Sequence, residues 1–494
     1  MVQRTFVSYH EIVILAIIWS DYLIKLLFTT YFNKYVIYVL AILMATTFLN
    51  PNSRNGAFLA FFLYLPTYLV CIIPGSAEVY EGRDVSLTGP FIPEYGYPLI
   101  LCPIIGTALM IYMGRYMELE PSGPYGVGHS YKPVIEDDFY MNSIVFYPVK
   151  KSEYDGYKYH IRQNLKWFQP GSDGISTQAK DNGLNPILMH ELLTYRIYSV
   201  EDRKLQKDFL AKHKKLTPVI VSHGITHWCT SLSAYILELV SHGCIVFTVD
   251  HTDGSCIGYK DFSKDPEEFV PYASHSEQTE LSQTQYHEKQ LKTRMKDVEY
   301  LLKFIKEEFK EEPWDIDFDN LVALGHSFGA TSAMEMCKTF PDAFKYCVAI
   351  DPWYMPNYKA IVEENYYDLK QPLLSLSTEL FHSDGPTGFM SKPWVQDKFD
   401  SLKANDAVFA SKTKNDKEGT NAGGSYKLIL KNTAHNDCSD KCLYMEKYEK
   451  ASLNSVDQSK YQVFINIVLA FLNEHNALPV DYHKQVMEIA SPHI

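Results

Sequence analysis

Four long apolar runs occupy the first part of the chain, at residues 12–32, 35–49, 57–73 and 97–113. Polar residues separate these runs, and few charges interrupt them. Because a helix needs about 20 apolar residues to cross the hydrocarbon core of a bilayer, the pattern predicts a transmembrane helical region of about four spans over residues 1–115. The second, third and fourth runs are somewhat shorter, so one of them is open to interpretation as a re-entrant or buried helix.

Arg4, Arg54 and Arg115 would share one side of the predicted helical bundle, whereas the opposite side carries Lys34, Arg83 and several acidic residues. Because Lys and Arg are enriched in cytoplasmic loops, we expect an integral membrane protein whose C-terminal domain faces the cytoplasm or its organellar equivalent. The sequence does not indicate which membrane. Membrane lipids are expected neighbours, and the predicted helices offer surfaces for membrane-protein partners.

From about residue 120 onward, short apolar and β-branched runs alternate with segments of helical periodicity. One such unit consists of a strand at 218–222, a helix at 231–240 and a strand at 244–249. This order predicts an α/β fold, a mostly parallel sheet flanked by helices, in a domain spanning residues 120–494. Further strands are expected at 143–148, 321–324, 347–350, 372–376 and 426–430, and longer helices at 290–308 and 461–473.

Charge and cysteine content narrow the possible partners and cofactors. The formal net charge is −13, from 59 acidic and 46 basic side chains, which argues against a nucleic-acid-binding surface. The nine cysteines are too few for a disulfide scaffold in a chain of this length. Cys438 and Cys442 have no second Cys/His pair at zinc-ligand spacing. No metal site and no cofactor are therefore predicted.

The segment LVALGHSFGATSAMEM, from Leu321, has the layout of a nucleophile elbow. In this motif a strand enters a sharp turn with a serine at its apex, and a helix of small residues follows. The turn brings backbone segments close together, and Gly325 and Gly329 have no Cβ atom to clash there. The sequence therefore predicts Ser327 as a nucleophile on an α/β-hydrolase fold.

A serine hydroxyl becomes an effective nucleophile only when a histidine takes its proton and a carboxylate orients that histidine. Five histidines follow Ser327 in the chain. His435 is preferred as the base over His382, because it follows a late strand and precedes the final long helix. The remaining three, near the C-terminus, are interpreted as surface or packing residues. His326, beside the nucleophile, is interpreted as structural.

Two positions suit the acid. Asp351 directly follows the strand at 347–350, whereas Glu379 and Asp384 follow the next strand. Both positions lie where open α/β sheets place their active sites. Asp351 is nearer to its strand end, and the apolar pair after it would shield an ion pair from water. These residue positions alone leave the choice open.

Acyl transfer also needs two N–H donors for the oxyanion that forms on the substrate carbonyl. In this fold one donor is the residue after the nucleophile, here Phe328. The other comes from a loop after an earlier strand, and the segment SHGIT at 222–226 occupies that position. The backbone N–H of Ile225 is therefore the expected second donor.

Taken together, several segments resemble the platelet-activating-factor acetylhydrolase family of serine-triad sn-2 phospholipases. They are GPYGVGHSYKP from Gly123, PVIVSHGITHWCTSLSAYILELVSHGCIVFTVDHTDGS from Pro218, LVALGHSFGA from Leu321, CVAIDPWYMP from Cys347, PLLSLSTELF from Pro372 and NTAHND from Asn432. They run in the family's order over roughly residues 120–475. The resemblance implies Ser327 as nucleophile, Asp351 as acid and His435 as base, with Ile225 and Phe328 as oxyanion donors.

The resemblance also implies a reaction, the calcium-independent hydrolysis of a short or oxidised sn-2 acyl ester of a glycerophospholipid through an acyl-serine intermediate. Trp353 and Phe381 are then expected to contact the acyl chain. The sequence departs from the family pattern at Thr226 and Ala330, where glycines are usual, and in a polar insertion between 381 and 435. These departures lie in the segments that we expect to shape the substrate range.

Two other functions remain in competition with this one. The first is an esterase or lipase on the same fold that acts on a different ester. The second is a hydrolase-like domain that serves as an accessory or scaffold subunit of a membrane complex. Substrate profiling with graded acyl chains separates the first from the family activity, and stable copurification with partners would support the second.

Overall fold

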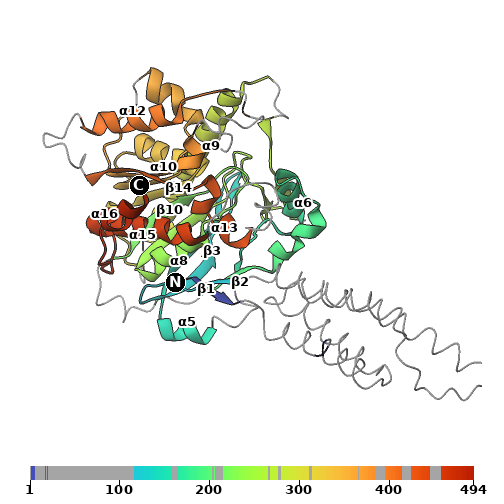
Figure 1. Ribbon diagram of the computed structural model, residues 1–494. Helices are drawn as coiled ribbons and strands as arrows, with labels where there is room; N and C mark the ends of the chain where they lie inside the picture. Colours follow the sequence, from blue (N-terminus) through green and yellow to red (C-terminus); the bar gives the residue numbers. More distant parts are fainter. Residues whose placement is uncertain are drawn as a thin grey trace, which may run out of the picture. The chain divides into compact units, whose positions relative to one another are not determined.

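The structure of the protein is a computed structural model. It describes residues 2–5, 17, 19 and, with gaps, 116–494, which are drawn in colour in Figure 1. The gaps are residues 158–164, 203–204, 206–214, 265–266, 276–279, 311–313, 365–366, 384–394, 396, 414–423 and 446–457.

The prediction of an integral membrane protein is wrong for the part of the chain that the structure describes. No helix there is long and apolar enough to cross a bilayer. Helix α9 (Gln283–Glu308) has 26 residues but carries charged side chains along its length, whereas the apolar helix α8 (Ser233–Ser241) has only nine residues. Apart from residues 17 and 19, the four apolar runs lie outside the described residues. The predicted orientation and the predicted partners of these helices therefore have no support.

A nine-stranded sheet forms the centre of the described domain. Its order is β17-β16-β15-β14-β10-β11-β6-β3-β9. The six strands from β17 to β11 pair in parallel, and β6 pairs antiparallel with both β11 and β3. The strands are β3 (Gly126–Tyr131), β6 (Ser143–Val149), β9 (Val200–Glu201), β10 (Thr217–Ser222), β11 (Cys244–Val249), β14 (Val322–His326), β15 (Tyr346–Ile350), β16 (Leu373–Thr378) and β17 (Tyr426–Leu430).

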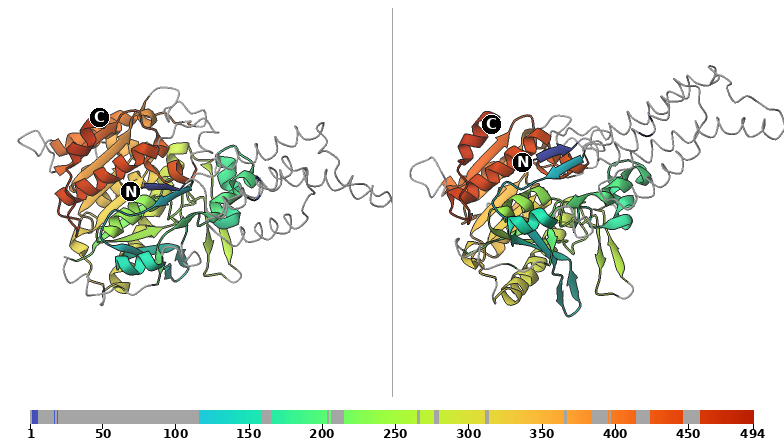
Figure 2. Two further views of the ribbon diagram at one scale, coloured as in Figure 1. Left: turned by 60° about the horizontal axis from the view of Figure 1, so that its bottom comes forward. Right: turned by 90° about the horizontal axis from the view of Figure 1, so that it is seen from below.

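Helices cover both faces of this sheet (Figures 1 and 2). Helix α8 packs on β11, β6 and β3, and α15 (Gln458–Glu474) packs on α8 and β16. Helix α10 (Phe328–Thr339) packs on β10, β14 and β15, and α9 packs on α10. Every residue of β10, β11, β14, β15 and β16 is consequently buried, which explains why these strands read as continuous apolar runs. The predicted mostly parallel α/β sheet is confirmed.

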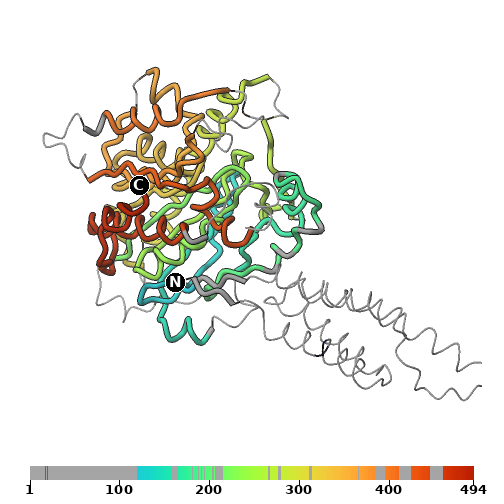
Figure 3. Tube along the Cα trace, viewed as in Figure 1, coloured from blue at the N-terminus to red at the C-terminus, as the bar shows by residue number. Residues whose placement is uncertain are grey.

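Segments that are distant in the sequence become neighbours in the sheet. The colours of Figure 3 show such segments side by side. Strand β10, for example, lies between β11 and β14, although about 100 residues separate β10 from β14 in sequence. The carboxyl ends of the parallel strands therefore meet at one edge, where the loops after β10, β14, β15, β16 and β17 gather. All the candidate site residues lie on these loops or directly after them.

The remaining elements are short. The strands are β1 (Val2–Thr5), β2 (Tyr116–Leu119), β4 (Val134–Glu136), β5 (Phe139–Met141), β7 (Leu165–Lys166), β8 (Arg196–Ile197), β12 (Gly258–Asp261) and β13 (Glu268–Pro271). The helices are α5 (Lys151–Tyr157), α6 (Gly171–Asp181), α11 (Glu379–His382), α12 (Ser401–Thr413), α13 (Lys441–Tyr444) and α16 (Val486–Ala490). The 3-10 helix η9 spans His435–Cys438.

The sheet and its helices belong to a unit made of residues 119–193 and 197–494. A second unit comprises residues 2–118 and 194–196, of which few residues are described. The boundary expected between residues 115 and 120 stays a prediction.

Candidate active site

The turn between β14 and α10 places Ser327 in a strained backbone conformation. Its φ is +60° and its ψ is −122°, a region that side-chain-bearing residues rarely adopt. A Cβ atom on Gly325 would lie 2.0 Å from the carbonyl oxygen of Gly329, and a Cβ atom on Gly329 would lie 2.0 Å from the carbonyl oxygen of Ser222. Only glycine fits at either position, so the two flanking glycines allow the turn that presents the serine.

Ser327, His435 and Asp351 lie in one hydrogen-bonded line. The Ser327 Oγ is 2.9 Å from Nε2 of His435, and Nδ1 of His435 is 2.6 Å from Oδ2 of Asp351. The three side chains come from three loops, after β14, β17 and β15. The structure thus brings together the three residues that the sequence predicted as nucleophile, base and acid.

Asp351 is a fully buried carboxylate with several donors. Besides His435, its Oδ1 accepts from the backbone N–H of Thr378 at 2.7 Å, and its Oδ2 accepts from the Thr378 hydroxyl at 2.7 Å. Oδ1 also lies 3.0 Å from Nε2 of His382. Burial alone would raise the pKa of Asp351, but the interaction with His382 and the hydrogen bond with His435 hold this pKa below its usual range. The carboxylate is therefore ionised at neutral pH.

Two aromatic rings flank the His435 imidazole. The Phe381 ring stacks on it with centroids 3.9 Å apart and an interplanar angle of 15°, and the His326 ring lies 4.6 Å away. Nε2 of His326 is 3.2 Å from the backbone carbonyl oxygen of His435. Burial, with a smaller contribution from His435, lowers the pKa of His326 to about 3. His326 is therefore neutral and helps to hold His435 in place.

The loop after β10 approaches the nucleophile closely. A Cβ atom on Gly224 would lie 3.2 Å from the Cβ of Ser327, so the backbone of this loop passes beside the serine. Thr226 has a φ of +55°, a left-handed conformation that costs a β-branched residue roughly 1–2 kcal/mol. Its N–H donates to the carbonyl oxygen of Ser255 at 2.9 Å. Thr226 thus holds a backbone conformation that glycine adopts more readily.

The two residues expected to contact the acyl chain lie in different surroundings. Trp353 is 3% exposed and packs with its ring 5.7 Å from that of Phe328 and 4.6 Å from that of His287. Its backbone N–H donates to the carbonyl oxygen of Ser327 at 3.2 Å. Phe381 instead covers one face of the His435 ring. Trp353 therefore contacts Ser327 and Phe381 contacts His435. Their role in binding substrate stays a prediction.

The residues weighed as alternatives have other positions. Glu379, in α11, accepts a hydrogen bond from the backbone N–H of Asn432 at 2.8 Å. Asp384 lies outside the described residues. His382, the second choice for the base, binds Asp351 through Nε2, and its Nδ1 lies 2.5 Å from the Ser401 hydroxyl. Sequence reasoning did not foresee this role, although the position of His382 after β16, beside the loop that carries Asp351, was a signal for it.

One buried group in the described residues has the composition of a metal site. Ligand atoms of His223, Asp250 and Cys256 lie within 4.8 Å of one another. Protein groups already use these atoms, because Nδ1 of His223 is 2.7 Å from the Gly224 carbonyl oxygen and its Nε2 accepts from the backbone N–H of His251. Burial raises the pKa of the Cys256 thiol well above its usual value, so the neutral thiol donates to Asp250. These contacts are those of an internal hydrogen-bonded cluster and do not call for a metal.

The fold and the serine turn define a class of protein. A mostly parallel sheet, a strained serine between β14 and α10, and a histidine and aspartate supplied by later strand ends are the features of an α/β-hydrolase. Within this class the chain belongs to the platelet-activating factor acetylhydrolase family. The family described as platelet-activating factor acetylhydrolase, isoform II, matches residues 114–492, which confirms the resemblance seen in the sequence.

Curated relatives carry the same name. The platelet-activating factor acetylhydrolase of Canis lupus familiaris is 27% identical over 232 residues, covering 43% of this chain and 51% of the relative. That of Bos taurus is 27% identical over 211 residues, covering 37% of this chain and 45% of the relative. The chain thus spans about half the length of the curated relatives that it matches.

Among solved structures, the ferulic acid esterase from Streptomyces cinnamoneus is similar with a TM-score of 0.45 and 14% sequence identity. The similarity covers 72% of this chain and 91% of that chain.

Proposed function

We propose that the protein is a serine esterase in which Ser327 is the nucleophile, His435 the general base and Asp351 the acid that orients the base. The observation that carries the proposal is the continuous line from Ser327 Oγ to His435 Nε2 at 2.9 Å and from His435 Nδ1 to Asp351 at 2.6 Å. A scaffold domain would not need this geometry, nor a strained serine backbone to present the hydroxyl.

In the proposed reaction, His435 Nε2 takes the proton of the Ser327 hydroxyl as Oγ attacks the ester carbonyl carbon. The carbonyl oxygen becomes an oxyanion, for which the N–H groups of Ile225 and Phe328 are the proposed donors. His435 then gives its proton to the leaving alcohol, and an acyl-Ser327 ester remains. A water molecule, deprotonated by His435, hydrolyses this ester and restores the serine.

The substrate class follows from the family and stays part of the proposal. We expect a glycerophospholipid with a short or oxidised acyl group at the sn-2 position, as the resemblance in the sequence implies. The names of the relatives specify an acetylhydrolase of platelet-activating factor. Phe381 and Trp353, which lie around the triad, are the proposed contacts of the acyl group. Hydrolysis of sn-2 esters with graded acyl lengths tests this class, and a preference for long unmodified chains would contradict it.

Labelling with a fluorophosphonate probe tests the nucleophile. We expect the purified full chain to be labelled, Ser327→Ala to take up no label, and His435→Ala to be labelled more than about 1,000-fold more slowly. His483→Ala, at an exposed histidine far along the chain, is the matched control and should label like the wild type. A folded wild-type protein that neither labels nor hydrolyses p-nitrophenyl acetate would contradict the proposal.

A further inference from the structure

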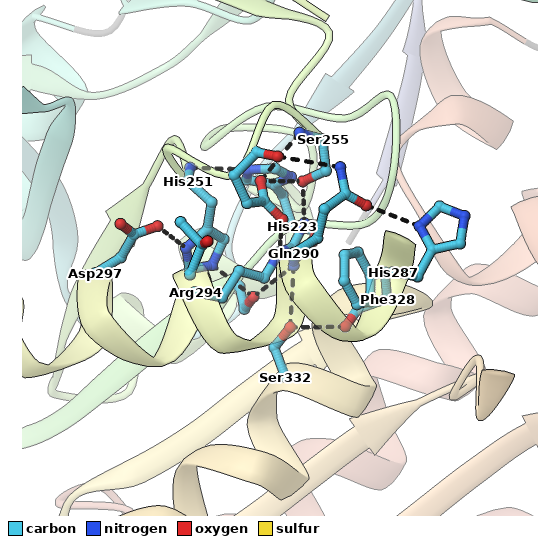
Figure 4. A network of polar contacts seen from close by, with 12 residues as sticks. His223, His251, Ser255, His287, Gln290, Arg294, Asp297, Phe328 and Ser332 are labelled. Atoms are coloured by element: carbon cyan, nitrogen blue, oxygen red, sulfur yellow. Dashed lines mark hydrogen bonds and ion pairs between the residues drawn. The ribbon is translucent and has the colours of Figure 1, made fainter. Parts of the chain in front are cut away.

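Arg294 lies fully buried on α9, below the loop after β10 (Figure 4). Burial of a guanidinium is unusual unless its donors are satisfied, and here each of its three nitrogens donates to at least one acceptor. Its Nε donates to the carboxylate of Asp253 at 2.8 Å, an ion pair in which both side chains are fully buried. Burial alone would raise the pKa of Asp253, but the charge of Arg294 and the hydrogen bonds from Ser255 and Arg294 together hold this pKa below its usual value, so the carboxylate is ionised.

One side of the guanidinium holds the loop that contains Ile225. Nη1 donates to the backbone carbonyl oxygen of His223 at 2.8 Å and shares a longer contact of 3.2 Å with the hydroxyl of Ser222. Nη2 donates to the hydroxyl of Ser255 at 2.5 Å. The carbonyl oxygen of Ser255 in turn accepts from the N–H of Thr226. Both ends of the loop are therefore tied to Arg294, and Ile225 lies between them.

The same guanidinium also holds the start of α10. Its carbon lies 4.0 Å from the centroid of the Phe328 ring, a cation–π contact in a desolvated position. Nη1 also lies 3.1 Å from the hydroxyl of Ser332, and this hydroxyl donates to the backbone carbonyl oxygen of Phe328 at 2.8 Å. Arg294 thus contacts the Phe328 ring directly and is linked to the Phe328 backbone through the Ser332 hydroxyl (Figure 4).

A second layer of side chains holds the groups that bind Arg294. His251 lies 2.8 Å from the Ser222 hydroxyl through Nε2 and 3.0 Å from Asp297 through Nδ1. Gln290, one turn before Arg294 on the same helix, donates to the backbone carbonyl oxygen of Asp253 at 3.1 Å. Figure 4 shows these side chains converging from α9 and the loops above it. The guanidinium is therefore fixed on several sides.

We propose that Arg294 is a positioning residue that fixes the two oxyanion N–H donors, Ile225 and Phe328, relative to each other. The inference rests on the proposed esterase function. These two donors come from segments about 100 residues apart, which continue from the paired strands β10 and β14 beyond the last partners, Ser222 and Gly325. Beyond the strands, no backbone hydrogen bond joins residues 223–226 to residues 327–329, all of which the structure describes. An oxyanion hole works only when both donors are preorganised, and misplacement by about 1 Å can slow a reaction roughly 100-fold.

A purely structural role makes a different prediction from a positioning role. If Arg294 only stabilised the fold, its replacement would lower the stability of the protein and leave the kinetics of the folded fraction unchanged. If it positions the donors, kcat falls in the folded protein while KM changes little, because the oxyanion exists only after the serine has attacked.

Two variants test the positioning role. Arg294→Lys keeps a positive charge opposite Asp253 but loses the planar fork that reaches His223, Ser255 and Ser332. Ser332→Ala removes only the hydroxyl between the guanidinium and the backbone of Phe328. Ser375→Ala is the matched control, because Ser375 is a buried serine on β16 whose hydroxyl contacts Asn405 instead.

The assay measures p-nitrophenyl acetate hydrolysis and inhibition by an alkyl trifluoromethyl ketone. Ser327 adds to this ketone, its proton moves to His435, and the ketone oxygen becomes an oxyanion that mimics the intermediate. We expect kcat to fall roughly 10- to 100-fold in Arg294→Lys and several-fold in Ser332→Ala, with KM nearly constant. The inhibition constant of the ketone should rise in the same proportion, and Ser375→Ala should match the wild type.

The outcomes separate this inference from the proposed function. An active wild type whose folded Ser332→Ala and Arg294→Lys variants keep kcat and ketone affinity overturns the role of Arg294 alone. A loss that appears in KM, with ketone affinity unchanged, overturns it as well. A folded wild type without any esterase activity overturns the proposed function and this inference with it. If Arg294→Lys does not fold, the milder Ser332→Ala variant decides the question.

Discussion

Two hydrogen-bonded networks meet at Ser327, and they are built from different kinds of groups. On the acid–base side are Asp351, His382, His435 and Thr378, and on the oxyanion side are Arg294, Asp253, Ser222, Ser255 and Ser332. The acid–base side joins a carboxylate to two imidazoles, and the His435 side chain is 25% exposed. The oxyanion side joins a guanidinium to a carboxylate, and neither is exposed.

The difference matches what each side has to do in the proposed reaction. The base must accept and release a proton in every cycle, so it needs a titratable ring beside the substrate. The oxyanion donors must keep their positions through the cycle. They are held by a guanidinium, whose charge stays constant because it does not lose its proton. Variants on the two sides should therefore fail in different ways, and the predictions below use this contrast.

The largest effect is expected from Asp351→Asn on the acid–base side. The amide keeps the shape of the carboxylate but removes the negative charge that orients and stabilises the protonated His435. We expect kcat to fall about 10⁴-fold, as in other serine triads that lose their acid. Steady-state hydrolysis of p-nitrophenyl acetate measures this loss.

The control for Asp351→Asn is Asp202→Asn, an aspartate that binds the hydroxyl of Ser130 far from the triad. It should keep the wild-type rate. A folded Asp351→Asn protein with nearly full activity would remove Asp351 from the triad and end the proposed contrast between the two networks.

A smaller effect is expected from His382, which holds the other oxygen of the Asp351 carboxylate. His382→Phe removes the Nε2 donor and leaves a buried charge with one hydrogen bond fewer, which we expect to lower kcat about 10-fold. His382→Gln places an amide N–H near the lost donor and should restore most of the rate. If the glutamine variant is no better than the phenylalanine variant, His382 acts through packing and not through its hydrogen bond to Asp351.

Local sequence patterns were sufficient to predict the strands, the serine turn, Ser327 as nucleophile and His435 as base, whereas the choice of Asp351 as acid came from the family resemblance. Each of these depends on a short segment, such as the glycines around Ser327, whose absent side chains the turn requires. The position of each residue directly after a strand then predicted that they would meet, because parallel strands end at one edge of the sheet. His382 was harder to interpret, because its partner Asp351 is 31 residues away and follows another strand.

Arg294 escaped sequence reasoning for a physical reason. The helix at 290–308 was predicted from its apolar positions, and Arg294 lies three residues after Leu291 and four before Val298, on the buried face of this helix. A charge at such a position indicates a buried partner, but Asp253 and Ser222 come from loops that only the tertiary structure brings there. The apolar runs before residue 115 predicted spans from composition alone. Apart from residues 17 and 19 these runs lie outside the described residues, among which no helix is long and apolar enough to cross a bilayer.

The smallest predicted effect is a loss of stability at low pH that arises from His287, near the oxyanion side. His287 lies about two turns before Arg294 on α9, and its Nδ1 is 2.7 Å from Oε1 of Gln290, whose amide donates to the backbone of Asp253. Burial lowers the pKa of His287 from 6.5 to about 4, against a smaller opposing effect of the hydrogen bond with Gln290. Between these two pH values the unfolded chain binds a proton at His287 that the native protein does not bind, so the native state loses stability as the pH falls from 6.5 towards 4.

At pH 5 the proton that only the unfolded chain binds should lower the free energy of unfolding by about 2 kcal/mol relative to neutral pH. Urea unfolding at pH 7.5 and pH 5 measures the loss, and in His287→Asn the loss should be smaller by about this amount. His483→Asn, at an exposed histidine, should keep the wild-type difference. An unchanged pH dependence in His287→Asn would mean that His287 takes up a proton in the native protein. A proton on a ring that contacts Gln290 and Phe328 would contradict the view that the oxyanion side keeps a constant charge.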